Sequence, residues 1–405
     1  MVKTANPWLR SLLRAGKKQQ RTVARALTSM LAVSTPKPKA KPRPKAAPKS
    51  APKATLKATP KATPRAAPAV KAIRLEKPFG ASPAPAASPR ASAAAPAAPA
   101  TGKWLASHFS GRPDRGAGPL RRMSYWLYLP DSAAAGAPLP LVVMLHGCDQ
   151  SATLFAQGTR MNQWAEKQGY AVVYPQQSVS AHPHRCWKWY DRATQQGGGD
   201  VSLIVGIVNK VMANYPIDRS RVYICGLSAG AGMANIVALN HPDLFAAIGL
   251  HSGPLYGAGH STLGALGVMK HGASGRVDSA IAEVLQRQPG FPDMPTMLLQ
   301  GEGDDVVRPV NQAQLTRQAM LLNRMPHGCA VNVSTKEGTR RANPYRVHDV
   351  YQDRRLMLRV AQIAELKHAW SGGDDSVSYH CGAGPDASKM LLDFFSKHRR
   401  ALNGA

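Results

Sequence analysis

Short apolar runs alternate with longer amphipathic stretches from Met123 to the end of the chain. The short runs are rich in β-branched and aromatic residues, whereas the longer stretches repeat apolar residues every three to four positions. This alternation predicts βαβ units, and hence a mainly parallel central sheet flanked by helices. The expected strands cover residues 124–129, 141–145, 171–174, 222–225, 247–250, 296–299 and 357–364.

The first hundred residues lack this pattern. Residues 35–101 consist almost entirely of Pro, Ala, Lys, Ser and Thr, with few side chains that could form a core. Ordering a backbone costs about 1 to 2 kcal/mol per residue, and burial of so few apolar groups cannot offset that cost. We therefore expect a disordered linker at residues 35–102, which frequent prolines and like charges keep extended.

Residues 1–34 differ from the linker because apolar side chains such as Trp8, Leu12 and Leu27 recur among arginines and lysines. The spacing is typical of a basic amphipathic helix that lies on an anionic membrane or a charged granule, but an unfolded basic arm has the same composition. The most apolar stretch, residues 26–33, is interrupted by Thr28 and Ser29, so no clear signal peptide is predicted. No run reaches the roughly 18 apolar residues of a transmembrane helix.

Positive charge is concentrated in the same region. Residues 1–102 contain 21 Lys and Arg residues against one acid, Glu76, and so carry +20 of the chain's net charge of +29. We expect three parts: a basic amphipathic segment at 1–34, the linker at 35–102 and one folded α/β domain at 103–405.

The five cysteines stand at positions 148, 186, 225, 329 and 381, without the spacing of a metal site. Cys225 ends an apolar run and is expected to be a buried thiol. The other four could form disulfides, which would indicate an oxidising compartment, and their pairing stays open. No metal or other cofactor is expected.

A candidate nucleophile follows the apolar run 222–225. That run leads directly into Gly-Leu-Ser-Ala-Gly at residues 226–230, and an Ala-rich helical pattern comes next. A strand, a sharp turn and a helix form a nucleophile elbow, in which the serine adopts a strained conformation and the glycines allow close backbone approach. We predict Ser228 as the nucleophile; the alternative is a glycine-rich turn with an incidental serine.

A serine hydroxyl needs a histidine base and a carboxylate that orients it, and in this type of site the chain order is Ser, acid, His. The strand expected at 296–299 leads into a turn with three carboxylates. We predict Asp304 as the acid, with Asp305 and Glu302 as alternatives.

The predicted base is His368, which follows the last expected strand and both other members of the triad. His146 and His251 also follow strands, but both precede the acid, and the chain order disfavours them.

An oxyanion hole requires backbone N–H groups that face the developing negative charge. The residue after the nucleophile, Ala229, is expected to supply one. The run 141–145 leads into His146, Gly147 and Cys148, so we predict the Cys148 N–H as the second donor, with Gly147 shaping the turn.

Together, His-Gly-Cys at 146–148, Cys-Trp-Lys-Trp-Tyr at 186–190, the elbow at 226–230, Asp304 and His-Ala-Trp at 368–370 resemble the poly(3-hydroxybutyrate) depolymerase family of esterases. The resemblance covers roughly residues 105–398 and implies an α/β-hydrolase fold and hydrolysis of carboxylic esters. Poly(3-hydroxybutyrate) or its oligomers are the expected substrates; because the family includes feruloyl and acetylxylan esterases, these activities are the alternative. The resemblance implies an extracellular enzyme, whereas the absence of a clear signal peptide leaves a cytoplasmic or granule-associated one open.

The resemblance also suggests roles for the segment at 186–190. Trp187 and Trp189 are expected beside the site, where they would contact an acyl chain or an aromatic acid, with core packing as the alternative. A disulfide between Cys148 and Cys186 would tie this segment to the oxyanion loop. Asp200 is expected to cap a helix that begins at Val201.

The sequence departs from the family pattern in two places. The acid loop begins with Gln300 and Gly301 where His-Gly is more usual, and a long glycine-rich loop is expected at residues 256–276.

Two functions of other classes stay open. The basic arm could be the functional part, as a tail that binds nucleic acid, a granule or another polyanion through release of counterions. The folded domain could also be a hydrolase scaffold without turnover, although an elbow, an acid, a base and an oxyanion loop in the required order argue against this.

Overall fold

The computed structural model describes residues 100–112, 119–326, 329–339 and 342–401. The predicted basic segment at 1–34 and nearly all of the predicted linker lie outside these residues, so both stay predictions. Among the helices of the described ranges, none has the length and apolar character needed to cross a bilayer.

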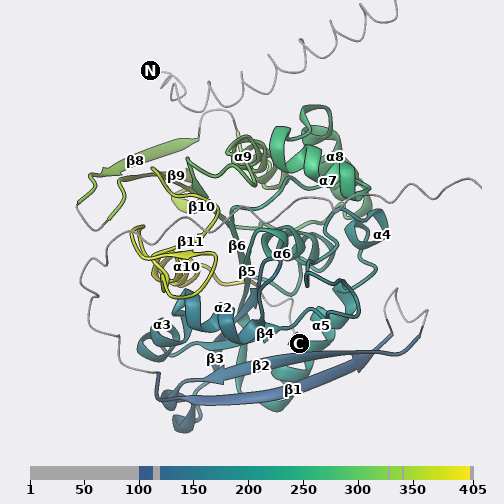
Figure 1. Ribbon diagram of the computed structural model, residues 1–405, viewed down its shortest axis with the longest axis vertical. Helices are drawn as coiled ribbons and strands as arrows, with labels where there is room; N and C mark the ends of the chain where they lie inside the picture. The colour runs from purple at the N-terminus through teal and green to yellow at the C-terminus, as the bar shows by residue number, and fades with distance from the viewer. Residues whose placement is uncertain (1–99, 113–118, 327–328, 340–341, 402–405) are drawn as a thin grey trace, which may run out of the picture. The chain divides into compact units, whose positions relative to one another are not determined.

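A ten-stranded sheet forms the centre of the described chain (Figure 1). Its strands are β1 (Lys103–Gly111), β2 (Arg121–Leu129), β3 (Leu139–Leu145), β4 (Ala171–Pro175), β5 (Ile217–Leu227), β6 (Ala247–His251), β7 (Thr296–Gly301), β8 (Ala330–Lys336), β9 (Tyr345–Gln352) and β10 (Arg355–Ile363). Their order is β1-β2-β4-β3-β5-β6-β7-β10-β9-β8. The six central strands, from β4 to β10, are mutually parallel, and the outer strands pair antiparallel.

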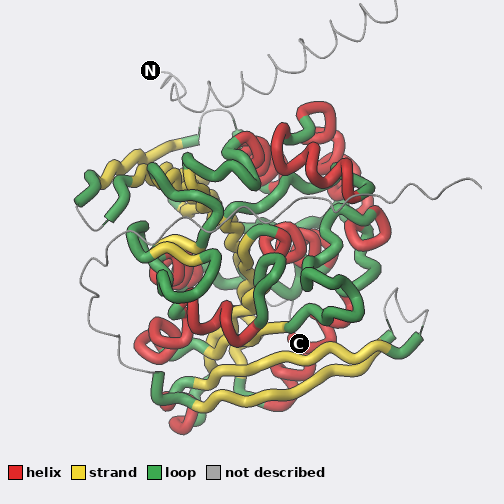
Figure 2. Tube along the Cα trace, in the orientation of Figure 1, coloured by secondary structure: helices red, strands yellow, loops and turns green. Residues whose placement is uncertain are grey.

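Helices cover both faces of this sheet (Figures 1 and 2). Those of the described chain are α2 (Ala152–Thr159), α3 (Met161–Gln168), α4 (Arg192–Gln195), α5 (Val201–Asn214), α6 (Ala229–Asn240), α7 (Thr262–His271), α8 (Val277–Arg287), α9 (Val310–Leu322) and α10 (Ala387–Phe395). One hydrophobic cluster joins the sheet to α5, α6, α8 and α9, and a second joins it to α2, α3 and α10. The sheet is therefore the middle layer of three.

Strand β3 shows why the central strands are readable in the sequence. Leu141, Val143 and Leu145 belong to one hydrophobic cluster, and Val142 and Met144 belong to the other. Successive side chains of a strand point to opposite faces, and both faces of this sheet are covered. Each central strand thus appears in the sequence as a continuous apolar run.

All seven predicted strands are present, in β2 to β7 and β10, and the prediction of a mainly parallel sheet flanked by helices is confirmed. Two expectations were incomplete. The glycine-rich stretch at 256–276 is not one long loop, because it contains α7 and a short 3-10 helix at Ser274–Arg276. The edge strands β1 and β8, and β9 beside β8, were missed, since their mixed polar and apolar residues form no apolar run.

Candidate active site

Ser228 occupies the turn between β5 and α6. Its backbone has φ 57° and ψ −121°, a conformation that L-residues rarely adopt and that is often found at functional sites. Steric contacts explain why both of these positions in the motif are glycine. A Cβ on Gly230 would lie 2.1 Å from the carbonyl oxygen of Leu145, and one on Gly226 would lie 2.6 Å from the same oxygen. The local geometry is that of a nucleophile elbow, with the Ser228 side chain partly exposed.

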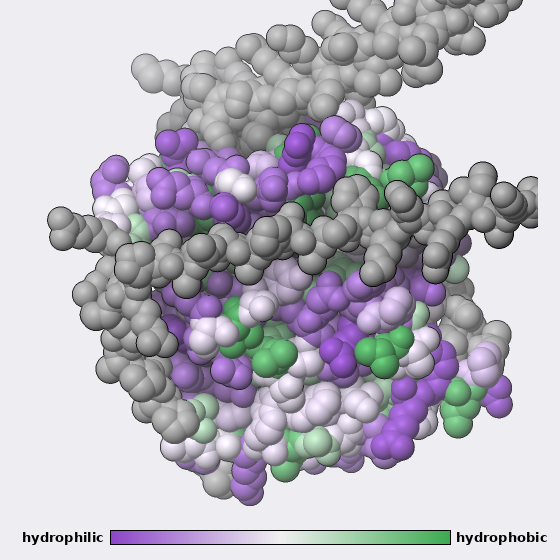
Figure 3. All heavy atoms as spheres, in the orientation of Figure 1, coloured by the Kyte–Doolittle hydropathy of each residue, from purple (hydrophilic) through white to green (hydrophobic). Residues whose placement is uncertain are grey.

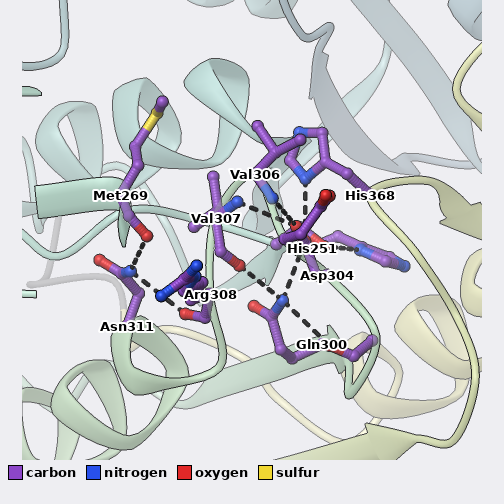
Figure 4. A network of polar contacts seen from close by, with 12 residues as sticks. His251, Met269, Gln300, Asp304, Val306, Val307, Arg308, Asn311 and His368 are labelled. Carbon is purple, nitrogen blue, oxygen red and sulfur yellow. Dashed lines mark hydrogen bonds and ion pairs between the residues drawn. The ribbon is translucent and has the colours of Figure 1, made fainter. Parts of the chain in front are cut away.

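The side chains of Asp304 and His368 point toward each other from the loops after β7 and β10 (Figure 4). His368 Nδ1 lies 2.8 Å from Asp304 Oδ2. The Asp304 side chain is fully buried, whereas 11% of the His368 side chain is exposed. The alternative acids, Asp305 and Glu302, are exposed to solvent, and His368 pairs with neither.

Asp304 is held by several donors besides His368. Its Oδ2 also accepts from Gln300 Nε2 at 3.0 Å, and its Oδ1 accepts the N–H groups of Val306 and Val307 at 3.0 and 2.9 Å (Figure 4). Burial opposes ionisation of this carboxyl, but hydrogen bonding and charge, from His368 above all, outweigh it and lower its pKa below the usual value. An ionised Asp304 accepts the Nδ1 proton of His368 and leaves Nε2 free to act as a base.

The predicted oxyanion loop lies directly against the elbow. A Cβ added to Gly147 would be 3.5 Å from the Cβ of Ser228 and 3.5 Å from the carbonyl oxygen of Leu227. Cys148 is the next residue, and Ala229 is the first residue of α6, where backbone N–H groups have no partner within the helix. The loop and the helix start thus meet at Ser228, and the donor roles of Cys148 and Ala229 stay predictions.

The oxyanion loop is fastened to the segment that precedes α4. A disulfide joins Cys148 to Cys186, as the sequence suggested. The Trp187 indole donates to the carbonyl oxygen of His146 at 2.9 Å, and the Asp149 N–H donates to His184 O at 2.7 Å. Together these bonds hold the loop against the segment 184–187.

His146 is a structural residue of this loop. It is fully buried, and burial lowers its pKa to about 4, so its ring is neutral at ordinary pH. The Gln177 N–H donates to Nε2 at 3.1 Å, which leaves Nδ1 to donate to Gly147 O at 2.7 Å.

Trp187 and Trp189 do not lie where the substrate prediction requires. They are 0% and 4% exposed and belong to the core cluster that contains α5 and α6. Neither ring offers an exposed face to an acyl chain, so the prediction of substrate contact is corrected to the alternative of core packing. The hydrogen bond from Trp187 to His146 gives that residue an indirect role, as support for the oxyanion loop.

The expectation for Asp200 was also wrong. Helix α5 begins at Val201, but the Asp200 side chain makes no capping hydrogen bond. It forms an ion pair with Arg121 at 2.8 Å and accepts from Gln177 Nε2 at 2.5 Å. Within the described ranges, no three or more His, Cys, Asp or Glu side chains are grouped so that they could hold a metal ion.

His251, which the chain order disfavoured as a base, lies within the polar network of the site (Figure 4). The ring is fully buried, and its Nε2 already accepts the N–H of Ser371 at 3.2 Å. It is therefore no general base for a substrate. A polar pair, His251 and Ser252, directly after a buried strand was the signal that could have marked this position.

Residues 123–344, more than half of the chain, match the family described as Esterase PHB depolymerase. The chain belongs to this family.

Three of the curated relatives of this chain carry different enzyme names. Poly(3-hydroxyalkanoate) depolymerase C of Paucimonas lemoignei is 31% identical over 47% of this chain and 46% of its own length. Feruloyl esterase B of Neurospora crassa is 36% identical over 32% of this chain and 43% of its own length. A probable acetylxylan esterase A of Aspergillus fumigatus is 34% identical over 36% of this chain and 38% of its own length. The chain spans less than half the length of each of these relatives.

An acetyl xylan esterase structure from Aspergillus awamori superposes with a TM-score of 0.56 at 20% sequence identity, over 72% of this chain and 99% of that one. This likeness concerns the fold alone. It confirms that this member of the PHB depolymerase esterases has the predicted α/β-hydrolase fold.

Proposed function

We propose that this chain is a serine esterase that hydrolyses carboxylic esters, with Ser228 as nucleophile, His368 as base and Asp304 as the acid that orients it. The observation that carries the proposal is the 2.8 Å contact between His368 Nδ1 and Asp304 Oδ2. His251 connects this pair to the elbow, because its carbonyl oxygen accepts the Ser228 N–H at 3.0 Å and its ring contacts the His368 loop.

In the first half of the reaction, Ser228 Oγ attacks the ester carbonyl while His368 Nε2 takes the hydroxyl proton. Asp304 stabilises the imidazolium that forms. The N–H groups of Ala229 and Cys148 donate to the oxyanion of the tetrahedral intermediate. When the intermediate collapses, His368 gives the proton to the alcohol that leaves, and the acyl group stays on Ser228.

Water completes the cycle. His368 takes a proton from the water that attacks the acyl-enzyme, and the second intermediate releases the acid and returns the proton to Ser228. Every proton transfer therefore uses the same imidazole, whose orientation depends on Asp304.

We propose polyhydroxyalkanoate, as poly(3-hydroxybutyrate) or its oligomers, as the substrate. One curated relative carries a poly(3-hydroxyalkanoate) depolymerase name. Exposed apolar side chains also support this class. Six of the nine large hydrophobic side chains that are exposed in the described chain lie on segments that follow the carboxyl ends of parallel strands: Leu154, Val179, Leu263, Leu266, Val306 and Tyr379.

Two of these side chains are near predicted site loops in the chain: Val306 lies two residues after Asp304, and Leu154 lies on α2, which follows the predicted oxyanion loop. Figure 3 shows exposed hydrophobic residues as separate patches on the face in view. We propose that these exposed side chains form an apolar rim at the site, which would contact a water-insoluble polyester more readily than a soluble sugar ester. Feruloyl or acetylxylan esterase activity is the alternative, because relatives with these names match at similar identity.

The deciding experiment compares the purified full chain with its Ser228→Ala variant on p-nitrophenyl esters, hydroxybutyrate oligomers, methyl ferulate and acetylated xylan. Hydrolysis by the wild type and loss of it in the variant support the serine mechanism. A preference for hydroxybutyrate esters supports the polyester proposal, whereas a preference for ferulate or acetylxylan moves the substrate to the alternative. Equal hydrolysis by both proteins contradicts the triad.

The apolar rim is tested separately with Leu263→Ser combined with Leu266→Ser, two side chains that are 80% and 50% exposed on α7. The variant should adsorb less to a poly(3-hydroxybutyrate) film but hydrolyse a soluble short-chain ester at the wild-type rate. Val333→Ser, at an exposed position on edge strand β8, is the matched control.

We also propose an extracellular location and a division into a basic segment at 1–34, a linker at 35–102 and the esterase domain at 103–405. The disulfide between Cys148 and Cys186 supports an oxidising compartment. The charge of residues 1–102 favours a tether to an anionic surface, granule or nucleic acid. Retention of the full chain on anionic vesicles, granules or DNA should weaken as salt rises and after Lys→Gln and Arg→Gln substitution of the arm, without loss of ester turnover. Salt-independent retention would contradict this.

A further inference from the structure

We propose that Gln300 is a positioning residue for the acid Asp304, and that its side-chain amide ties the carboxylate to an anchored backbone position of the same loop. The inference rests on the proposed esterase function and adds a residue that the triad and the oxyanion hole do not include. Gln300 lies on β7, one residue before the strand ends, and is only 2% exposed. A side chain this buried acts on the reaction through its neighbours.

Gln300 Nε2 faces three oxygen acceptors (Figure 4). It lies 3.0 Å from Asp304 Oδ2, 3.0 Å from the carbonyl oxygen of Val307 and 3.4 Å from that of Gly301. An ionised carboxylate and backbone carbonyls accept hydrogen bonds and donate none, so this end of the side chain must be its NH2 group. The two protons of that group therefore serve Asp304 and Val307, the two nearer acceptors.

The peptide groups of Val307 close a ring of hydrogen bonds with this amide. The N–H of Val307 donates to Asp304 Oδ1 at 2.9 Å, and its carbonyl oxygen accepts from Gln300, which also donates to Asp304 Oδ2. Each carboxylate oxygen is thus held by a donor, and the two donors are joined to each other. Rotation of the carboxylate would break bonds on both sides of the ring.

The backbone that follows Val307 is anchored to α7 (Figure 4). The Arg308 N–H donates to the carbonyl oxygen of Met269 at 2.9 Å. Asn311, a fully buried residue of α9, donates through Nδ2 to the carbonyl oxygens of Met269 at 2.9 Å and Arg308 at 3.2 Å. The amide of Gln300 therefore connects the carboxylate to a part of the acid loop that two helices hold.

The oxygen that Gln300 holds is the one that orients the base. Asp304 Oδ2 accepts from Gln300 at 3.0 Å and lies 2.8 Å from His368 Nδ1. Without the amide, Oδ2 would lose a donor that takes no part in proton transfer, and a shift of this oxygen would move the imidazole with it. A displacement of about 1 Å in such a site can cost about 100-fold in rate.

The first test is Gln300→Met, which keeps the length of the side chain and removes both donors. We expect kcat on a soluble p-nitrophenyl ester to fall about 10- to 100-fold, as for loss of one hydrogen bond to a charged group. KM should stay within about twofold of wild type, because acylation and deacylation use the same imidazole. Turnover is expressed per active site, counted by complete labelling with a fluorophosphonate, so that unfolded protein does not lower it.

Gln300→Glu supplies a second readout, the dependence on pH. The new carboxyl has the shape of the amide but can donate to Asp304 only while it is protonated, and once ionised it repels the Asp304 carboxylate. We expect kcat of this variant, divided by wild-type kcat at the same pH, to fall between about pH 5 and 9 as the carboxyl ionises. A side chain that only fills space would give a constant ratio.

Gln318→Met is the matched control. Gln318 is 3% exposed, and its amide donates to the carbonyl oxygens of Tyr256 at 3.0 Å and Val277 at 3.3 Å. These bonds link α9 to the segments at the start of α8 and before α7 rather than to the acid loop, so the variant should lose stability but keep the wild-type kcat per active site.

Three results would overturn the positioning role: wild-type kcat in Gln300→Met, an equal loss of kcat in Gln318→Met, or a constant ratio in Gln300→Glu. Failure of the proposed esterase function is distinguishable from all three. In that case Ser228→Ala would retain turnover, or the wild type would hydrolyse no ester.

Discussion

Asp304 and His368 follow two paired parallel strands whose last residues stand opposite each other. β7 ends at Gly301 and β10 ends at Ile363, and these two residues stand opposite each other in the parallel ladder. The acid follows the first strand by three residues and the base follows the second by five. Parallel pairing therefore brings two residues that are 64 positions apart into a 2.8 Å contact.

Substitution of each carboxylate should show whether Asp304 or its exposed neighbour Asp305 is the catalytic acid. Asp304→Asn should keep the fold but lower kcat by on the order of 10³- to 10⁴-fold, because the amide favours the wrong tautomer of His368. Asp305→Asn should change kcat no more than about twofold. Steady-state kinetics on a soluble ester checks both, and the reverse order of effects would identify Asp305 as the acid.

The disulfide between Cys148 and Cys186 should raise both the stability of the fold and kcat. The disulfide closes a loop between cysteines that are 38 positions apart. Combined Cys148→Ser and Cys186→Ser substitution removes this constraint and should lower the free energy of unfolding by about 3 to 4 kcal/mol. We expect kcat to fall as well, by up to about 100-fold, since the Cys148 N–H is then less firmly held. Urea unfolding and kinetics measure the two effects. Cys329→Ser, at a free cysteine, is the control, and wild-type kcat in the double variant would contradict the oxyanion role.

The elbow glycine and a helix glycine should respond to alanine in opposite ways. A Cβ on Gly230 would meet two backbone oxygens, of Leu145 and His146, at 2.1 and 2.5 Å, so Gly230→Ala should destabilise the fold by about 3 kcal/mol or more. On exposed Gly267 of α7 a Cβ meets nothing within 4 Å, and Gly267→Ala should stabilise by about 0.5 to 1 kcal/mol. Thermal unfolding of the two variants decides this, and equal effects would contradict the elbow geometry.

His398 should make the protein less stable in acid. Burial, followed by the charges of Arg355, Lys397 and Arg359, lowers its pKa to about 4 in the folded state. The unfolded chain, with a histidine pKa near 6.5, takes up the proton first, so stability falls as the pH drops from about 6.5 toward 4. Between pH 6.5 and 4.5, His398→Gln should lose about 2 kcal/mol less stability than wild type in urea unfolding. Equal losses in both proteins would contradict the lowered pKa.

The strands that the sequence predicted are mainly those that are buried on both faces and so appear as continuous apolar runs. Every apolar run expected as a strand is one, because strands such as β3 face two hydrophobic layers. Edge strand β8 gives no such signal, since nearly all its side chains are exposed. Its antiparallel pairing with β9, from Ala330 opposite Tyr351 to Lys336 opposite Tyr345, leaves no periodic apolar signal in the sequence.

The candidate site residues likewise include some that the sequence pattern predicts and some that it does not. Ser228, Asp304 and His368 follow strands in the expected order, so their approach follows from topology, although their catalytic roles stay predictions. The burial of Trp187 was not predictable, because the segment from 176 to 191 has no period that distinguishes an inward from an outward ring.

The strand order has a consequence for the folding reaction. The candidate triad follows β5, β7 and β10: β7 pairs directly with β10, whereas β5 is joined to them through β6, which lies between β5 and β7. Parallel strands pay the entropy of closing long loops before they pair, and such contacts form slowly. Enzymatic activity therefore requires the completed sheet. During refolding, we expect activity to return only when these long-range strand pairs have formed, after the helices and the hairpins.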